Sequence, residues 1–253
     1  MKALVTGASS GIGRDMARYL GSKHYDLIIT ARRTDRLLEL KKEIEEKYGV
    51  NVRVITCDVA DEKQCRGLYE QTKNDGVDML INNAGFGIHG KFSEIDLDRE
   101  LNLIDTNIRA VHILTKLFLK DFVKKDSGCI LNVASSAGFL AGPLLSSYYA
   151  SKNYVVRLTQ GIYEELRREK SNVKISALCP GPVKTEFDKV ANVKFAMDGV
   201  SSEYVAKYAI DKALRGKMII IPGMLMKLSK FWERFLSEKA VTKISYNIQK
   251  RKN

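Results

Sequence analysis

A tyrosine and a lysine four residues apart are the pair in this sequence whose types and spacing could do chemistry. Tyr148 and Lys152 stand at positions i and i+4 of a segment with helical periodicity, so both side chains lie on one face of the helix. A free phenol has a pKa of about 10, and a neighbouring ammonium lowers that pKa by favouring the phenolate. The pair is therefore suited to proton transfer near neutral pH. Tyr149 has no such partner, because the residue four positions further on is Asn153.

A glycine-rich turn near the N-terminus could hold a phosphate group. It follows an apolar run and precedes a helical segment that begins at Arg14. Glycines at this spacing allow a tight turn and let the backbone approach a pyrophosphate, whose negative charge is stabilised by the helix N-terminus. The residues of the turn predicted to contact a dinucleotide are Gly7, Ser9, Ser10, Gly11, Ile12 and Gly13.

The end of the second apolar run predicts which dinucleotide binds. NAD-binding folds place an acidic residue here for the ribose 2′-hydroxyl, whereas this run ends in Arg32 and Arg33. A guanidinium pairs with a 2′-phosphate that a carboxylate would repel. We therefore predict NADP(H) in preference to NAD(H), with Arg32 as the first choice for the phosphate ligand and Arg33 as the second. The alternative is that both arginines are solvated and pair with Asp35 or Glu39.

Short apolar runs rich in β-branched residues alternate with longer helical patterns along the chain. The predicted strands are Ala3–Thr6, Asp26–Ala31, Asn51–Cys57, Asp78–Asn82, Cys129–Ala134, Lys174–Cys179 and Met218–Ile221. The clearest helical segments are Arg33–Tyr48, Leu97–Lys124 and Ser147–Lys170. Strands that are apolar on both faces predict an α/β fold, a three-layer doubly wound (Rossmann) parallel seven-stranded sheet with helices on both faces. We expect this catalytic and dinucleotide-binding domain over residues 1–223, followed by a basic helical extension over 224–253 that packs on it.

Further motifs follow in a characteristic order. Asn82-Asn83-Ala84-Gly85 ends the fourth predicted strand, Asn107 lies in a long helical segment, and Ser135-Ser136 ends the fifth strand. Pro180-Gly181-Pro182-Val183 and Thr185 follow the sixth strand. Together with the glycine turn and the Tyr-x-x-x-Lys pair, these motifs make the sequence resemble the short-chain dehydrogenase/reductase family over at least residues 1–222, in its NADP(H)-preferring, carbonyl reductase-like branch.

The resemblance implies a role for each matching position. Tyr148 would donate a proton to a carbonyl oxygen, Lys152 would lower the pKa of Tyr148 and hold the nicotinamide ribose, and Asn107 would anchor a water in the proton relay. Ser135, thirteen residues before Tyr148, would orient the substrate, with Ser136 as its rival. The other positions implied to contact the cofactor are Asp58, Val59, Asn83, Ala84, Gly85, Pro180, Gly181, Val183 and Thr185.

The resemblance implies that Asp58 binds the adenine amino group, and the alternative is that Asp58 caps the helix after the third strand. Ser10 stands where many NADP-preferring relatives carry a basic residue. Recognition of a 2′-phosphate would therefore depend on Arg32 and its neighbour.

Two segments near the C-terminus concern the substrate and partners. The stretch 186–197 follows Thr185, where the family places a substrate lid, and Phe187, Phe195 and Met197 would line an apolar pocket; a core-packed helix is the alternative. The chain has a net charge of +12, and residues 224–253 hold eight basic against two acidic side chains. Within them Leu225–Leu236 has the pattern of an amphipathic helix, which predicts packing over the active site or at an oligomer interface. Weak peripheral membrane contact or acyl-carrier docking is the alternative.

We therefore expect an NADPH-dependent oxidoreductase that reduces a moderately hydrophobic ketone or aldehyde, or reversibly oxidises a secondary alcohol, as a homodimer or homotetramer. The four cysteines are widely separated, which predicts no metal site and a cytoplasmic protein with reduced thiols. No motif resembles a base-reading module, so nucleic-acid binding is not expected. The alternatives are a non-catalytic nicotinamide-nucleotide-binding sensor or scaffold, and an NAD-dependent epimerase or dehydratase.

Overall fold

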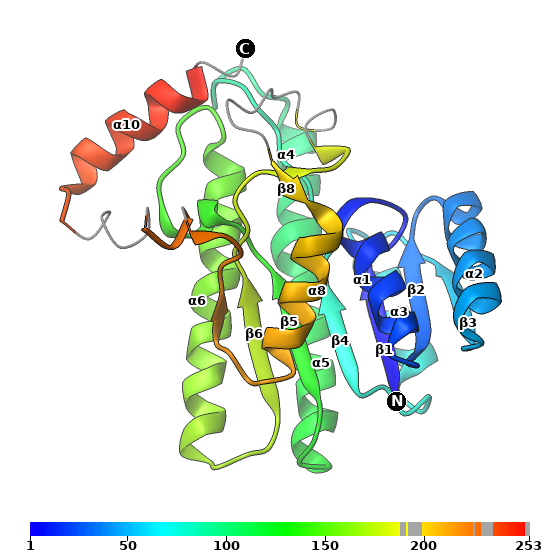
Figure 1. Cartoon of the computed structure of the whole chain (residues 1–253). Coiled ribbons are helices and arrows are strands. Elements are labelled where there is room, and N and C mark those ends of the chain that lie inside the picture. The colour runs from blue at the N-terminus through cyan, green and yellow to red at the C-terminus, as the bar shows by residue number, and fades with distance from the viewer. Residues whose placement is uncertain (188–190, 192–198, 225, 229–234, 251–253) are drawn as a thin grey trace.

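A seven-stranded parallel sheet forms the centre of the part of the chain that the structure describes (Figure 1). The structure is a computed structural model, and it describes residues 1–187, 191, 199–224, 226–228 and 235–250. The strand order is β3-β2-β1-β4-β5-β6-β9. The strands are β1 (Lys2–Thr6), β2 (Asp26–Ala31), β3 (Val52–Thr56), β4 (Met79–Asn82), β5 (Cys129–Val133), β6 (Lys174–Leu178) and β9 (Ile219–Ile220).

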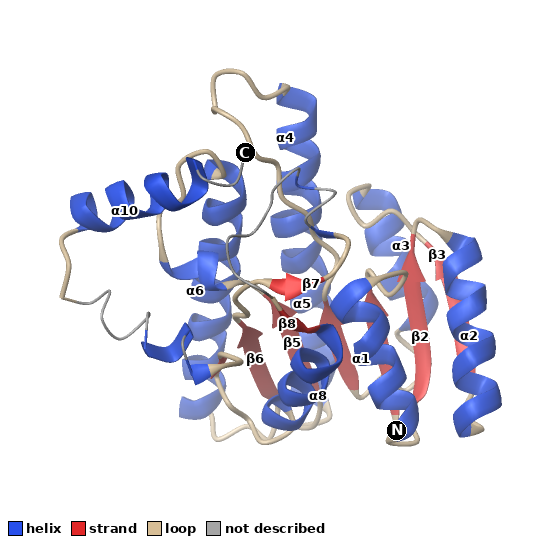
Figure 2. Ribbon diagram, turned by 45° about the horizontal axis from the view of Figure 1, so that its top comes forward, coloured by secondary structure: helices blue, strands red, loops and turns tan. Residues whose placement is uncertain are grey.

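Helices cover both faces of the sheet (Figure 2). The helices on one face are α1 (Gly11–Ser22), α2 (Thr34–Tyr48) and α8 (Ser202–Ala213). Those on the other face are α3 (Glu62–Thr72), α5 (Ala110–Lys124) and α6 (Ser146–Arg168). Ala3 and Val5 of β1 pack with the first group, and Leu4 between them packs with the second. The strands are thus apolar on both faces, and the predicted three-layer doubly wound fold is confirmed.

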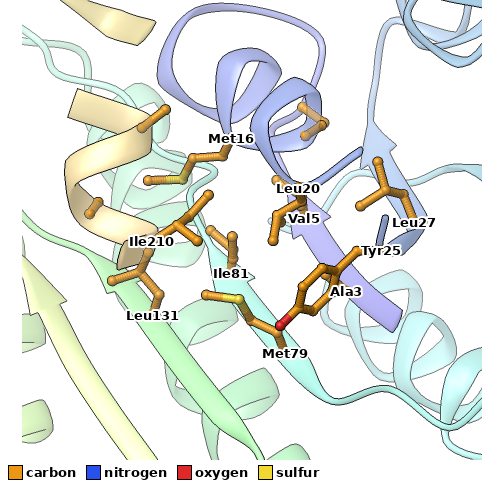
Figure 3. Close-up of a cluster of buried hydrophobic side chains, with 14 of the residues drawn as sticks. Ala3, Val5, Met16, Leu20, Tyr25, Leu27, Met79, Ile81, Leu131 and Ile210 are labelled. Carbon is orange, nitrogen blue, oxygen red and sulfur yellow. The ribbon is translucent and has the colours of Figure 1, made fainter. Parts of the chain in front are cut away.

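A buried apolar cluster joins α1 and α8 to the central strands (Figure 3). Met16 and Leu20 of α1 and Ile210 of α8 are fully buried in this cluster, as are Val5 and Ile81 of the sheet. Burying an apolar side chain of this size contributes about 1.5–3 kcal/mol. The cluster therefore holds the N-terminal end of α1, where the glycine turn lies, at a fixed place above the sheet.

A buried polar network ties the middle of the sheet to the opposite helix layer. Asn82 of β4 donates hydrogen bonds to Asn132 Oδ1 of β5 at 2.8 Å and to Thr115 Oγ1 of α5 at 3.0 Å. Asn132 in turn donates to Thr159 Oγ1 of α6 at 3.0 Å. All four side chains are buried, and Asn82 pairs with Asn132 in the strand register. The network keeps the carboxyl ends of β4 and β5 aligned with each other and with α6.

The long helical segment predicted over Leu97–Lys124 is not uniform. It consists of α4 (Leu97–Ile104), a π-helical turn η1 (Asp105–Arg109) and α5. Such turns are rare and occur frequently at functional sites, and this one contains Asn107. Hydrophobic periodicity does not reveal the turn, because the helix continues on both sides of it.

Three local features differ from the expectation or add to it. A separate pair of short parallel strands, β7 (Val183–Lys184) and β8 (Val200–Ser201), was not predicted, and a short 3-10 helix, η2 (Ser136–Phe139), follows β5. The alternative role of Asp58 as a helix cap is wrong. Asp61 caps α3 instead, since its carboxylate accepts a hydrogen bond from the Gln64 amide at 2.9 Å.

The C-terminal region contributes α10 (Glu238–Lys250), which lies at the end of the sheet where the strands terminate (Figure 1). Its inward side chains are polar: Ser245 is 5% exposed and Gln249 is 1% exposed, whereas Ile244 and Ile248 are about half exposed. Most of the helix predicted at Leu225–Leu236 lies outside the described residues. The division of the chain at residue 223 stays a prediction. No described helix has the length and apolar character needed to cross a membrane.

Candidate active site

Tyr148, Lys152 and Ser135 come together where β5 ends and α6 begins. Lys152 Nζ lies 5.8 Å from the centroid of the Tyr148 ring and donates a hydrogen bond to the Val133 carbonyl at the end of β5, at 2.9 Å. Ser135, two residues beyond Val133, forms a side-chain hydrogen bond with Tyr148. The rival serine, Ser136, is held by a backbone hydrogen bond to the Pro180 carbonyl at 2.8 Å. Of the two serines, Ser135 is the one whose side chain contacts the phenol.

Burial controls the protonation of this pair. It raises the pKa of Tyr148 to about 12, and the hydrogen bond from Ser135 only partly opposes the rise. This pKa shift is opposite in direction to the one expected from the ammonium. The free-energy cost of removing a phenolate from water exceeds the stabilisation that the nearby groups provide. Burial also lowers the pKa of Lys152 to about 8. At neutral pH Tyr148 therefore keeps its proton, and a protonated phenol is the form that can donate to a carbonyl oxygen.

Asn107 is fully buried and bound at both ends of its amide. Its Oδ1 accepts from the Phe86 amide at 3.1 Å, and its Nδ2 donates to the Phe86 carbonyl at 2.9 Å and to Ser151 Oγ at 3.0 Å. These bonds connect the loop after β4 to α6, one residue before Lys152. Asn107 thus positions the surroundings of the lysine, and its role in a water relay stays a prediction.

The glycine turn is held closely against the end of β4. Gly7 and Gly11 have φ angles of +65° and +54°, which is the left-handed region that favours glycine. A Cβ on Gly7 would lie 2.8 Å from Ala84 Cα. Asn83 Nδ2 donates to the Thr6 and Gly7 carbonyls at 3.0 and 3.1 Å. Residues Gly7 and Ser9–Ile12 of the turn also line a cavity, which leaves room for a pyrophosphate beside the backbone.

A cavity of about 690 Å³ runs from the glycine turn to Tyr148. It is lined by every residue predicted to contact the dinucleotide except Gly13. A Cβ on Gly13 would lie 2.6 Å from the Gly7 carbonyl oxygen, so this glycine allows close packing under the turn. An elongated cavity with open backbone at one end and a phenol at the other fits a nicotinamide dinucleotide.

The two candidate arginines have different surroundings. Arg33 Nε and Nη2 donate to Ser9 Oγ at 3.2 and 3.1 Å, and Nη2 also donates to Ser10 Oγ at 2.8 Å. The side chain of Arg32 is 69% exposed and pairs with Asp58 at 3.7 Å. The structure therefore brings the second choice, not the first, to the glycine turn. The guanidinium of Arg33 covers Ser10, the position at which the sequence departs from its NADP-preferring relatives.

The sequence patterns did not predict two further charged residues beside Arg33, namely Glu186 and Arg36. Glu186 accepts hydrogen bonds from Arg36 at 2.6 Å and from Arg33 at 3.0 Å. These two bonds lower the pKa of Glu186 to about 2, so it is an anion at neutral pH. The i, i+3 spacing of the arginines at the start of α2 was the available signal, since such residues share one helix face. The ion partners of Arg32 and Arg33 in the described structure are thus Asp58 and Glu186, in place of Asp35 and Glu39.

The end of the cavity near Tyr148 is mainly apolar. The ring of Phe187 packs on Tyr148 with ring centroids 5.3 Å apart. Gln249 of α10 hydrogen-bonds the hydroxyl of Tyr149. The other lining residues at this end include Phe139, Leu140, Leu145, Met226 and Ile248. Phe195 and Met197, the other predicted wall residues, lie outside the described residues. The contributions of Met226, Ile248 and Gln249 could not be read from local patterns, because these residues lie far away in the sequence from the rest of the site.

A doubly wound sheet that places a glycine turn and a Tyr-Lys pair on one cavity defines a dinucleotide-binding oxidoreductase. The chain matches the family model of the short chain dehydrogenases over residues 1–194. It is 31% identical over 239 residues to the NADP-dependent 3-hydroxy acid dehydrogenase of Schizosaccharomyces pombe, an alignment that covers 88% of this chain and 90% of the relative. It is 32% identical over 216 residues to the very-long-chain 3-oxoacyl-CoA reductase of Homo sapiens, covering 82% of this chain and 67% of that protein. The chain therefore belongs to the short-chain dehydrogenase/reductase family.

Solved structures agree with this assignment. The short-chain dehydrogenase from Sphingobium yanoikuyae in complex with NADPH aligns with a TM-score of 0.85 at 27% identity, covering 92% of this chain and 91% of that one. A short-chain dehydrogenase/reductase from Burkholderia phymatum in complex with NAD shares the fold, with a TM-score of 0.84 at 24% identity over 92% of each chain. Structural neighbours thus bind either nicotinamide dinucleotide.

Proposed function

We propose that this chain reduces a ketone or aldehyde with NADPH, and reversibly oxidises the corresponding secondary alcohol, with Tyr148 as the proton donor. The observation that carries the proposal is the partly buried phenol of Tyr148, bonded to Ser135 and beside Lys152, on the cavity that begins at the glycine turn. Bound NADPH supplies the hydride for the carbonyl carbon.

The residues of the chain hold and direct the carbonyl group. A carbonyl oxygen placed between Tyr148 and Ser135 accepts a hydrogen bond from each hydroxyl, and both bonds strengthen as negative charge develops on that oxygen. Tyr148 then transfers the proton that burial retains on its oxygen. The ammonium of Lys152 stabilises the phenolate that is left behind.

The walls of the cavity indicate the substrate class. Apolar side chains surround the phenol, which favours a moderately hydrophobic carbonyl compound over a small polar sugar. The net charge of +12 favours anionic substrates over cationic ones. Since two relatives act on 3-hydroxy acids and 3-oxoacyl-CoA by name, 3-oxo acids and 3-oxoacyl thioesters come first in an assay panel. Assembly as a homodimer or homotetramer stays a prediction.

Replacing the phenol tests the reaction. Tyr148→Phe should lower kcat by about 10²–10⁴, because it removes the proton donor, and should leave NADPH binding nearly unchanged. Consumption of NADPH is followed by absorbance and binding by fluorescence titration. Tyr149→Phe is the matched control, since it removes a hydroxyl one residue further along, and it should keep most of the turnover. Turnover by Tyr148→Phe close to that of the parent would remove Tyr148 from the role of acid.

Replacing the arginines tests the cofactor. Arg33→Ala should weaken NADPH binding by about tenfold or more, which corresponds to about 1.4 kcal/mol, and should affect NADH much less. The reason is that Arg33, held at the serines of the glycine turn, is the candidate ligand of the 2′-phosphate, which NADH lacks. Arg32→Ala, which removes an exposed guanidinium, should have the smaller effect. Equal losses for NADPH and NADH in Arg33→Ala would contradict the preference for NADPH.

A further inference from the structure

Glu186 lies on the wall between two cavities. A second cavity of about 560 Å³ adjoins the dinucleotide cavity, and Glu186 lines both of them. Arg33 lines the dinucleotide cavity and Arg36 lines the second. One carboxylate oxygen of Glu186 contacts Arg33 at 3.0 Å, and the other contacts Arg36 at 2.6 Å. The carboxylate thus connects two cations that face different cavities.

These contacts give Glu186 the surroundings of a bound phosphate. Arg33 is oriented by Ser9 and Ser10, to which its Nε and Nη2 donate, while its Nη1 donates to Glu186. Two guanidiniums beside serine hydroxyls at a glycine turn are the donors that a phosphate monoester prefers. A carboxylate and a phosphate dianion cannot share these donors at close range, because like charges repel.

We propose that Glu186 is a specificity-determining residue that competes with the 2′-phosphate of the dinucleotide for Arg33 and Arg36. The proposal depends on the proposed use of NADPH. When no phosphate is present, the carboxylate neutralises the two arginines. A 2′-phosphate takes the arginines and displaces the Glu186 side chain, whereas the 2′-hydroxyl of NADH leaves it in place. Glu186 therefore weakens the binding of NADPH and has little effect on the binding of NADH.

The second cavity offers a place for the displaced carboxylate. Arg14 and Lys184 line it together with Glu186. The Nε of Arg14 is buried and has no hydrogen-bond partner among the described residues. The side chain of Glu186 is 42% exposed, so it can rotate without disturbing the core. Movement toward Arg14 and Lys184 exchanges one set of cations for another, although Arg14 also pairs with Glu43 at 3.8 Å and Asp15 lines the same cavity.

Glu186→Gln tests the competition, because glutamine has nearly the same size and no charge. The dissociation constant for NADPH should fall by about fivefold, whereas that for NADH should change by less than about twofold. Both are measured by fluorescence titration without substrate. Adenosine 2′,5′-bisphosphate, which carries the phosphate but no nicotinamide, should follow NADPH in a competition titration. Glu39→Gln is the control, since Glu39 affects Arg36 through charge at longer range, and it should leave the NADPH to NADH ratio unchanged.

Several outcomes would overturn the proposal. Weaker NADPH binding by Glu186→Gln would mean that the carboxylate orients Arg33 instead of competing for it. Unchanged binding, or an equal change for both dinucleotides, would also refute the competition. The test is independent of turnover: selective tightening without reduction of any carbonyl compound refutes the proposed function alone, and reduction without selective tightening refutes the competition alone. Failure of the parent protein to bind both NADPH and the bisphosphate refutes both.

Discussion

The protonation states at the site follow from how deeply each side chain is buried. Lys152 is 4% exposed and has its pKa lowered to about 8, while the pKa of Tyr148 is raised to about 12. Both shifts favour the neutral forms, as expected when charged groups lose water. The phenol of Tyr148 thus keeps its proton. Of the two groups, the Lys152 ammonium has the pKa closer to physiological pH.

The pH dependence of reduction follows from these values. The value of kcat/KM for carbonyl reduction should fall as the pH rises through about 8, because Lys152 loses its proton there while Tyr148 keeps its own until about 12. The measurement is a profile of initial rates at limiting substrate between about pH 6 and about pH 10. In Lys152→Arg the residual activity should lose this break, since a guanidinium stays charged over the whole range. A break that persists in this variant would assign the titration to another group.

Two adjacent residues connect the ends of the cavity. Glu186 contacts the arginines near the glycine turn, and Phe187 packs on the ring of Tyr148. The proposed displacement of Glu186 would therefore occur one peptide unit away from Phe187, the residue that packs against Tyr148.

At the scale of the element, α10 is unusual in turning polar side chains inward. Ser245 and Gln249 are buried, and Gln249 bonds Tyr149, whereas the apolar Ile244 and Ile248 remain half exposed. The reason is that α10 lies over the wall of a cavity instead of over the apolar core. Ile248 and Gln249 both line that cavity, which makes α10 a part of its wall near Tyr148 and Tyr149.

Gln249→Ala should therefore raise the KM for the carbonyl substrate by about fivefold, with kcat and NADPH binding nearly unchanged. The variant removes one of the two side chains that hydrogen-bond Tyr149, the other being Ser245, without touching Tyr148 or Lys152. Steady-state kinetics with the best substrate of the panel give KM and kcat separately. Asn247→Ala, an exposed position on the same helix, is the control and should behave like the parent. A loss confined to kcat would show that α10 affects the reaction in some other way.

At the scale of the whole molecule, the buried network of Asn82, Thr115, Asn132 and Thr159 connects the two central strands to two helices. Asn132 is central, because it accepts from Asn82 and Thr115 and donates to Thr159. Buried polar groups that lose a partner keep the full cost of leaving water. The network therefore stabilises one relative placement of β4, β5, α5 and α6, and with it the placement of the site.

Asn132→Ala should lower the free energy of unfolding by about 2–3 kcal/mol, since it removes the three buried hydrogen bonds that Asn132 makes with Asn82, Thr115 and Thr159. Urea unfolding followed by circular dichroism measures the change. Asn74→Ala, at an exposed turn, should change stability by less than about 0.5 kcal/mol. A similarly small change in Asn132→Ala would mean that the network contributes little to the fold.

The sequence alone was sufficient for the features that depend on neighbours along the chain. The strands, the glycine turn and the pairing of Tyr148 with Lys152 follow from periodicity and spacing, which are local properties. The predicted helix over Leu97–Lys124 was right in extent, but its π turn at Asn107 was not visible, because a π turn changes the hydrogen bonding without changing the residue types.

The tertiary structure decided what depends on distant partners and on burial. It placed Arg33, and not Arg32, against the serines of the glycine turn. It also brought together Glu186 and Arg33, which are 153 residues apart in the sequence, and Gln249 and Tyr149, which are 100 residues apart. It also reversed the expected direction of the Tyr148 pKa shift. Helical spacing sets only how near a lysine lies to a tyrosine. How much water surrounds the phenol depends on every element packed against it, so that quantity exists only in the folded chain.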